Sequence, residues 1–364
     1  MGETILNRTV KILLLVFLIS LILFKGKPFL VPLVFAALFS MLLLPVSLKL
    51  EGWGLGRGLS IVLSVLLIVA FFAGVISLLA WQVSDMAQKA PEIEKNISQK
   101  TQQLKEYVSN SFGISQQKQQ EMIQKQQQTS SSKTTAMISG ALASAGSILT
   151  DFLLMLVYIF LFMYFRMHLK KFVLKLVPKT EQAHTTKVLE NSRKVAQKYI
   201  TGLMLMIVGL WIMYSIGFAI AGVKNFFFFA VLCGLLEIVP FVGNLLGNAL
   251  TIIVTLAQGG GMNVVIGILI TYALVQFIQS YILEPLVVGS EVSINPVFTI
   301  IAIIAGEFIW GIPGMILAIP VLGIFKIVFD NVESLKPYGF LIGEEEQKSK
   351  SGFLDTIKGW FGKS

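Results

Sequence analysis

Long apolar runs are the feature that most limits how this chain can fold. A helix needs about 20 apolar residues to cross the roughly 30 Å of hydrocarbon in a bilayer. Runs near or above that length occur at residues 10–24, 28–48, 58–81, 138–165, 201–222 and 263–283. Only 13% of the residues are charged, against about 25% in a soluble domain. The polar surface is too small to cover a globule, so the sequence predicts an all-α polytopic membrane protein.

Two further apolar blocks, residues 226–257 and 296–328, do not fit a simple span. As continuous helices they would measure about 48–50 Å, which is too long for one upright crossing and too short for two. The first is interrupted at EIVPFVG and the second at WGIPG. Proline removes an amide donor and clashes with the preceding turn, so breaks are expected there. We therefore expect about eight apolar segments, two of them broken or re-entrant hairpins.

Polar segments indicate the topology. Residues 84–137 include QQKQQEMIQKQQQTSSSK, and this composition favours an extramembrane helical hairpin. Residues 166–198 hold nine Lys or Arg against two Glu, which predicts a cytoplasmic location. Counting spans from there places both termini in the cytoplasm and the Gln-rich hairpin outside, although Lys25 and Lys27 then lie on the wrong side. The C-terminal GFLDTIKGWFG predicts an amphipathic helix, lying in the membrane interface or packed on the protein's own cytoplasmic face.

These patterns divide the chain into five parts. They are N-terminal spans (1–83), the Gln-rich hairpin (84–137), a span with the basic cytoplasmic segment (138–200), a transport core with both broken blocks (201–330) and a cytoplasmic tail (331–364).

Several classes of function lack support in the sequence. The net charge of +9 comes from basic residues beside apolar runs, as topology signals do, so nucleic-acid binding is not expected. The chain has no G-x-x-x-x-G-K-[ST], H-E-x-x-H, G-x-S-x-G or T-V-G-Y-G motif, which argues against ATP-driven transport, hydrolysis and a potassium filter. His168 and His184 have no partner at metal-ligand spacing. We expect no enzyme activity, no cofactor and no metal.

A carboxylate precedes each break, Glu237 in the first block and Glu307 in the second. The residues predicted to form the hinges are Pro240, Gly243, Gly311, Pro313 and Gly314. A charge in hydrocarbon costs at least about 2.5–3.5 kcal/mol, and unpaired backbone groups are also costly, so both features predict a polar cavity. A full span precedes each block, which predicts an inverted-topology repeat with a site near the midplane. Either Glu could carry a coupling proton, or could only bind the amides that the kink frees.

Amide side chains are the other candidates for the substrate path. Asn244 and Asn248 are four residues apart and so share a helix face, and Gln276, Gln279 and Ser280 form a second polar stripe. Hydrogen bonding between helices explains such residues equally well. Because no Arg or Lys accompanies them, the inventory favours a cation or a neutral solute.

The sequence resembles the autoinducer-2 exporter (AI-2E) family of bacterial membrane proteins in GLLEIVPFVGNLLG (234–247) and ILEPLVVGSEVSINPVFTIIAIIAGEFIWGIPGMILAIPVLGIFKIV (282–328). The shared features are I-x-P-x-x-G, E-P-x-x-x-G, N-P, G-I-P-G and A-x-P, in that order. Besides the hinge residues, they include a loop motif made of Glu284, Pro285, Gly289 and Pro296. Asn244 stands where relatives often have proline.

The resemblance implies a homo-oligomeric transporter in the bacterial plasma membrane, with a pentamer as one candidate. Some relatives export the signal autoinducer-2, and others exchange sodium or lithium for protons. We therefore expect secondary export of a small solute with proton coupling, and sodium(lithium)/proton antiport is the alternative. A channel-like pore and a non-transporting scaffold are further alternatives. The expected partners are the lipid bilayer, protons and a small solute or monovalent cation.

Overall fold

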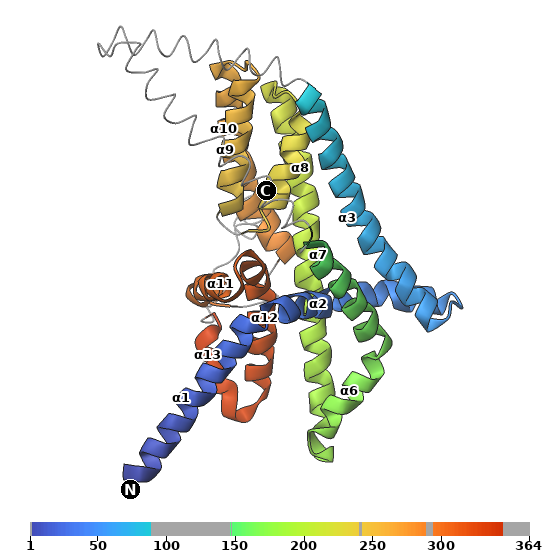
Figure 1. Cartoon of the computed structure of the whole chain (residues 1–364), viewed down its shortest axis with the longest axis vertical. Coiled ribbons are helices and arrows are strands. Elements are labelled where there is room, and N and C mark those ends of the chain that lie inside the picture. Colours follow the sequence, from blue (N-terminus) through green and yellow to red (C-terminus); the bar gives the residue numbers. More distant parts are fainter. Residues whose placement is uncertain (1, 89–145, 147, 240–241, 289–293, 345–364) are drawn as a thin grey trace, which may run out of the picture.

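The computed structural model describes residues 2–88, 146, 148–239, 242–288 and 294–344, which are helical almost throughout (Figure 1). Within these residues six helices are long and apolar enough to cross a membrane, or seven if a bent pair counts as one span. No described residue belongs to a β-strand, and a single antiparallel bridge joins Ile294 to Gly343. The prediction of an all-α polytopic membrane protein is confirmed.

The first predicted spans correspond to α1 (Gly2–Lys25), α2 (Lys27–Gly52) and α3 (Arg57–Gln88). The fourth is a helix over Ile148–Tyr164 that bends by 67° into α6 (Arg166–Lys175). Apolar side chains of α2, α3 and the 148–164 helix form one core: Ala36, Leu43, Ile61, Ile68, Met155, Ile159 and Met163.

A single helix, α7 (Gln182–Ala221), forms the axis of the molecule (Figure 1). Its 40 residues make it about 60 Å long. The predicted boundary between the basic cytoplasmic segment and the transport core, at residues 200 and 201, lies within this helix. Because the hydrocarbon core is about 30 Å thick, α7 is about twice as long as one upright crossing requires. The helix ends at Gly222, whose φ of 79° lies in the left-handed region that glycine adopts without strain.

The first broken block is two helices, α8 (Phe226–Leu236) and α9 (Val242–Ala257). This hairpin packs on the second half of α7 and on α10 (Met262–Ile278). Its tip is tight, since a Cβ on Gly243 would lie 1.6 Å from the Leu236 carbonyl oxygen. Only glycine fits there. Pro240 lies outside the described residues.

The second broken block is α11 (Pro296–Trp310) and α12 (Ile312–Asn331), joined by Gly311. Gly311 has a φ of 70°, which reverses the chain direction without a Cβ clash. The two helices touch at Gly306 and Gly314, where a Cβ on Gly314 would lie 1.9 Å from the Gly306 carbonyl oxygen. Leu317 of α12 packs with Ala196 and Ile200 in the first half of α7.

The segment after α10 differs from the prediction. The sequence predicts that the span ends at Glu284, before a loop, but the chain continues as a π-helix, η2 (Gln279–Val288), that contains Glu284 and Pro285. A π-helix pairs backbone groups five residues apart, and such turns are frequent at functional sites. Pro296 opens α11 instead of lying in a loop. Gly289, most of the Gln-rich hairpin and the predicted C-terminal amphipathic helix lie outside the described residues.

After α12 the chain turns back and packs on that helix. A 3-10 turn, η4 (Glu333–Leu335), leads into α13 (Lys336–Ile342), which packs on α12. Near the end of α12, Lys326 donates to Asp330 at 2.6 Å. This pair is spaced four residues apart and so links successive turns of one helix face.

Candidate functional site

A buried hydrogen-bond network lies between α7, α9 and α10. The Tyr214 hydroxyl of α7 donates to Asn244 Oδ1 at 3.0 Å, and Asn248 Nδ2 donates to the same oxygen at 3.0 Å. Asn244 Nδ2 donates to Gln276 Oε1 of α10. Gln276 Nε2 then donates to the Ser280 hydroxyl at 3.2 Å. Tyr214, Asn244 and Asn248 are buried, whereas Gln276 is half-buried and Ser280 is exposed, so the network runs from the packed interior to the surface.

Glu237 joins the same group of helices from the tip of the first hairpin. It directly follows α8, and its Oε1 accepts a hydrogen bond from Gln279 Nε2 at 2.8 Å. Gln279 is buried and is the first residue of the π-helix η2. The hairpin tip is therefore tied to the point where the regular turns of α10 give way to wider ones.

Four of the predicted path residues and one predicted carboxylate are thus brought together. The spacing of Asn244 and Asn248, and of Gln276 and Gln279, correctly indicates shared helix faces. Spacing does not show that the two faces meet each other. Packing of α9 against α10 makes them one polar region.

An apolar cavity of about 390 Å³ lies between α2, α3, the 148–164 helix, α7 and the two hairpins. The first hairpin contributes Leu235 and Ile238, and the second contributes Pro313, Ile316, Leu317 and Pro320. The wall from α7 is Tyr199, Ile200, Leu203, Met204 and Ile207. Glu237 itself does not line the cavity, although Leu235 and Ile238, on either side of it in the chain, do.

Glu307 has different surroundings. It is exposed on α11 and does not line the cavity. Its backbone carbonyl accepts from the Gly311 amide at 2.7 Å, but among the described residues its side chain has no hydrogen bond or ion pair. The structure therefore does not bring Glu307 into contact with Glu237.

The hinge and motif residues lie at the ends of helices. Gly243 is in the first turn of α9, Gly311 separates α11 from α12, and Pro313 stands in the first turn of α12. Pro296 opens α11, where the Asn295 side chain accepts from the Val297 amide at 2.9 Å and caps the helix.

Two residues of this region are missing from the sequence prediction. The sequence pattern does not single out Tyr214 as a site residue, because a tyrosine within an apolar run can equally be part of the core. Asp151 lines the cavity and is the one charged residue among its lining residues. A carboxylate inside a predicted span was a usable signal, since such residues are costly in hydrocarbon.

The described residues contain no group of three or more His, Cys, Asp or Glu that could hold a metal ion. The network instead offers neutral amides, one phenol and one carboxylate. It can accept and donate hydrogen bonds, and it can bind or release one proton at Glu237.

The sequence of this chain is similar to that of a transporter family and of several bacterial proteins. The sequence model described as "AI-2E family transporter" matches residues 12–334. The chain is 27% identical over 312 residues to "Putative transport protein YrrI" of Bacillus subtilis, covering 83% of this chain and 86% of the relative. It is 25% identical over 344 residues to "Putative transport protein YueF" of the same species, covering 89% and 91%. To "Putative transport protein YhhT" of Escherichia coli K12 it is 22% identical over 321 residues, covering 88% and 89%.

Proposed function

Because this chain belongs to the AI-2E family of transporters, we propose that it is a secondary active transporter that exports a small polar solute in exchange for protons. The two hairpins, α8–α9 and α11–α12, form the moving parts in this proposal, and Glu237 carries the coupling proton. The relatives named above come from bacteria, which supports the bacterial plasma membrane as the location in this proposal.

The observation that carries the proposal is the hydrogen bond between Glu237 and Gln279, beside a cavity that both hairpin tips line. An ionised carboxylate only accepts hydrogen bonds, whereas a protonated one also donates. Protonation of Glu237 therefore changes which partners hold the hairpin tip. A ligand shifts a conformational equilibrium when it binds one state better than another, and a proton at this position meets that condition.

The lining of the site favours a neutral or cationic solute. Neither the polar network nor the described cavity wall includes Lys, Arg or His. A buried anion without a cationic partner would lose its hydration with little compensation. A small neutral solute such as autoinducer-2 can instead bind amide and hydroxyl groups.

Sodium(lithium)/proton antiport is the second candidate, and the ligand types favour it specifically. Hard monovalent and divalent cations prefer oxygen ligands. The Glu237 carboxylate, the Asn244 amide oxygen and the Tyr214 hydroxyl supply such oxygens within one group of packed helices. In this alternative the cation and the proton compete for Glu237.

Flux in proteoliposomes tests both candidates. Purified protein is reconstituted with a pH-sensitive dye inside, a pH gradient is imposed, and autoinducer-2, Na⁺ and Li⁺ are added separately. We expect proton movement with one of these and its loss in Glu237→Gln, which keeps the side-chain size but cannot ionise. Glu307→Gln is the matched variant, and we expect it to retain more flux because Glu307 is exposed and outside the network. Full flux in Glu237→Gln would remove this residue from the mechanism.

A further inference from the structure

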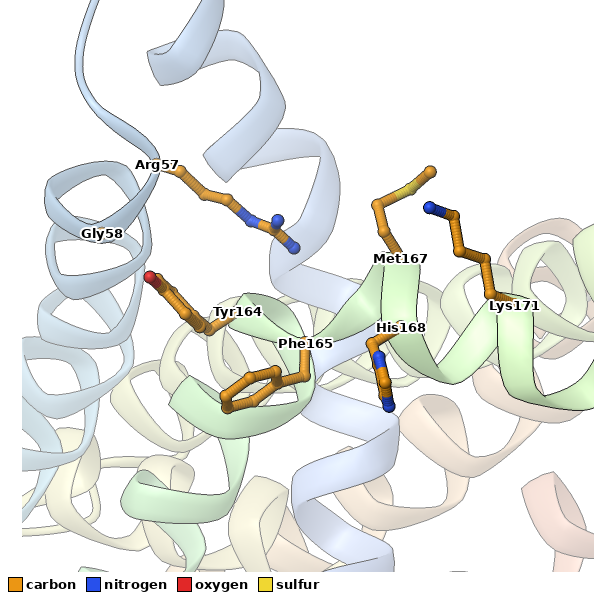
Figure 2. A pocket seen from close by; sticks show the side chains of 7 residues that line it. All are labelled: Arg57, Gly58, Tyr164, Phe165, Met167, His168 and Lys171. Carbon is orange, nitrogen blue, oxygen red and sulfur yellow. The ribbon is translucent and has the colours of Figure 1, made fainter.

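A second pocket, of about 530 Å³, lies far from the hairpin tips, where α3 begins and where the 148–164 helix bends into α6 (Figure 2). Arg57, His168 and Lys171 supply basic groups to its wall, and Tyr164, Phe165 and Met167 supply apolar ones. No Asp or Glu lines it. The pocket is therefore positively charged and partly apolar, a combination that the proposed transport mechanism does not use.

Arg57 is held in place but keeps donors to spare. Its Nη2 donates to the Met163 carbonyl at 3.1 Å, and its guanidinium carbon lies 5.4 Å from the centre of the Tyr164 ring. Its Nε is buried and has no hydrogen-bond partner. Its Nη1 makes no hydrogen bond within the described residues. A guanidinium carries five N–H donors in a planar fork that suits phosphate, so Arg57 keeps donors for a ligand that enters the pocket.

Lys171 approaches the same space from α6. Figure 2 shows Arg57 and Lys171 on opposite sides of the pocket, with the Met167 side chain drawn between their charged ends. Within the described residues Lys171 has no carboxylate partner, whereas its neighbour Lys170 pairs with Glu190 at 3.3 Å. An anion that enters the pocket would be attracted by both cations.

The nearby carboxylate of Glu51 is already engaged. Arg166 donates to both of its oxygens, at 2.9 and 2.7 Å, and Ser47 donates to one of them at 3.3 Å. A bidentate pair of this kind is among the stronger interactions available to a carboxylate. Glu51 also lies near enough to Arg57 to interact with it electrostatically. It is bound to Arg166, however, and Lys171 has no acidic partner within the described residues.

The surroundings identify a membrane interface. Trp53 and Tyr164 are exposed by 71% and 42%, and Trp and Tyr concentrate at the level of the lipid headgroups. The exposed residues Leu169 and Phe172 follow along α6, next to its lysines, and Leu176 lies at its C-cap. An apolar face beside basic residues is typical of a helix that lies in the interface.

We propose that this pocket binds the phosphate of an anionic phospholipid. Arg57 and Lys171 contact the phosphate, and the acyl chains run along the exposed apolar surface of the adjoining helices. Each basic residue near an anionic membrane surface adds about 1 kcal/mol, and direct hydrogen bonds to phosphate add to this. This proposal is independent of the transported solute.

Lipid binding to the full-length protein in detergent micelles tests the proposal. Short-chain phosphatidylglycerol and phosphatidylcholine are titrated, and binding is followed by native mass spectrometry and by the shift in melting temperature. We expect preferential binding of phosphatidylglycerol. Lys171→Gln should weaken it about fivefold, and the Arg57→Gln, Lys171→Gln double variant at least tenfold, roughly as the loss of one and two basic contacts implies.

Lys175→Gln is the matched control, because Lys175 is an exposed lysine of the same helix that does not line the pocket. We expect it to bind phosphatidylglycerol as the unaltered protein does. Lys171→Gln still tests the proposal if the Arg57 variant does not fold, since Lys171 is exposed and its side chain makes no hydrogen bond or ion pair within the described residues.

Three outcomes would overturn the proposal. One is equal binding of phosphatidylglycerol and phosphatidylcholine. Another is an equal loss of binding in Lys175→Gln and Lys171→Gln. The third is stabilisation by inorganic phosphate at the concentrations where phosphatidylglycerol acts, which would assign the pocket to a free phosphate.

Discussion

Tyr214 shows how one side chain organises the polar interior. Its hydroxyl donates to Asn244 Oδ1 and accepts from Asn248 Nδ2 at 3.3 Å, so it joins α7 to two positions on α9. The ring is fully buried and lies 5.2 Å from that of Phe218. Loss of the hydroxyl leaves the Asn244 and Asn248 side chains with one hydrogen-bond partner fewer each, while the apolar packing of the ring is retained.

We predict that Tyr214→Phe lowers the free energy of unfolding by about 1 kcal/mol, the usual scale for a hydrogen bond between membrane helices. Reversible denaturation in mixed micelles measures this change. Tyr281→Phe is the control, because Tyr281 is 73% exposed and its hydroxyl has no hydrogen bond within the described residues. A similar effect of both substitutions would show that the network does not stabilise the fold.

The two carboxylates illustrate what local sequence can and cannot predict. Glu237 and Glu307 each stand a few residues before a Pro-and-Gly break, and on sequence alone they are equivalent candidates. In the structure one is hydrogen-bonded to Gln279 beside a cavity, and the other is exposed on α11. The difference arises from the partner helices, which are distant in the sequence.

At the level of elements, the α11–α12 hairpin depends on small residues at two places. Gly311 supplies the left-handed turn, and Gly306 and Gly314 let the helices touch. The sequence predicts Gly311 and Gly314 as hinge residues but does not include Gly306. That residue could have been found from its spacing, since the chain reverses between it and Gly314.

We predict that Gly314→Ala destabilises the protein by about 1–3 kcal/mol, because the added methyl group cannot fit against the Gly306 carbonyl without separating the helices. Melting temperature in detergent reports the effect.

Gly74→Ala is the matched control for this substitution. A Cβ on Gly74 in α3 would meet no atom within 4 Å, so alanine should stabilise that helix by about 0.5–1 kcal/mol. The two substitutions should therefore shift the melting temperature in opposite directions. Shifts in the same direction would contradict the close contact between α11 and α12.

The sequence analysis predicts neither the full length of α7 nor the π-helix η2, for two different reasons. The absence of Gly and Pro from residues 182–201 was a sequence signal that the basic segment and the following span form one helix. No comparable local signal reveals the π-helix at Gln279, because its wider turns pack on α7 and depend on that contact.

At the scale of the whole molecule, the two hairpins use different halves of α7. The α8–α9 hairpin packs on the second half and α12 on the first (Figure 1). Residues of both hairpins and residues 199–207 of α7 line one cavity. This arrangement is compatible with two hairpins that enter a membrane from opposite sides, as in transporters built from inverted repeats.

We predict that deletion of residues 100–130 leaves solute flux in proteoliposomes unchanged. That segment is polar and Gln-rich, and the candidate site is built from apolar spans elsewhere in the chain. The same deletion should abolish function if the protein is instead a scaffold that binds partners through this segment. Flux and folded yield are measured together, and loss of flux with normal yield would contradict the prediction.

By itself, the sequence determined the lipid solvent, the helical class and the places where the two long apolar blocks break. Those properties depend on composition and on the local chemistry of Pro240, Gly243, Gly311 and Pro313, which act within a few residues of themselves. Only the tertiary structure decided that Gln279 donates to Glu237, that Tyr214 bonds to two asparagines and that Arg57 and Lys171 line one pocket. Such pairings follow from how whole helix faces pack, and packing sums many weak contacts between distant segments that no short stretch of sequence contains.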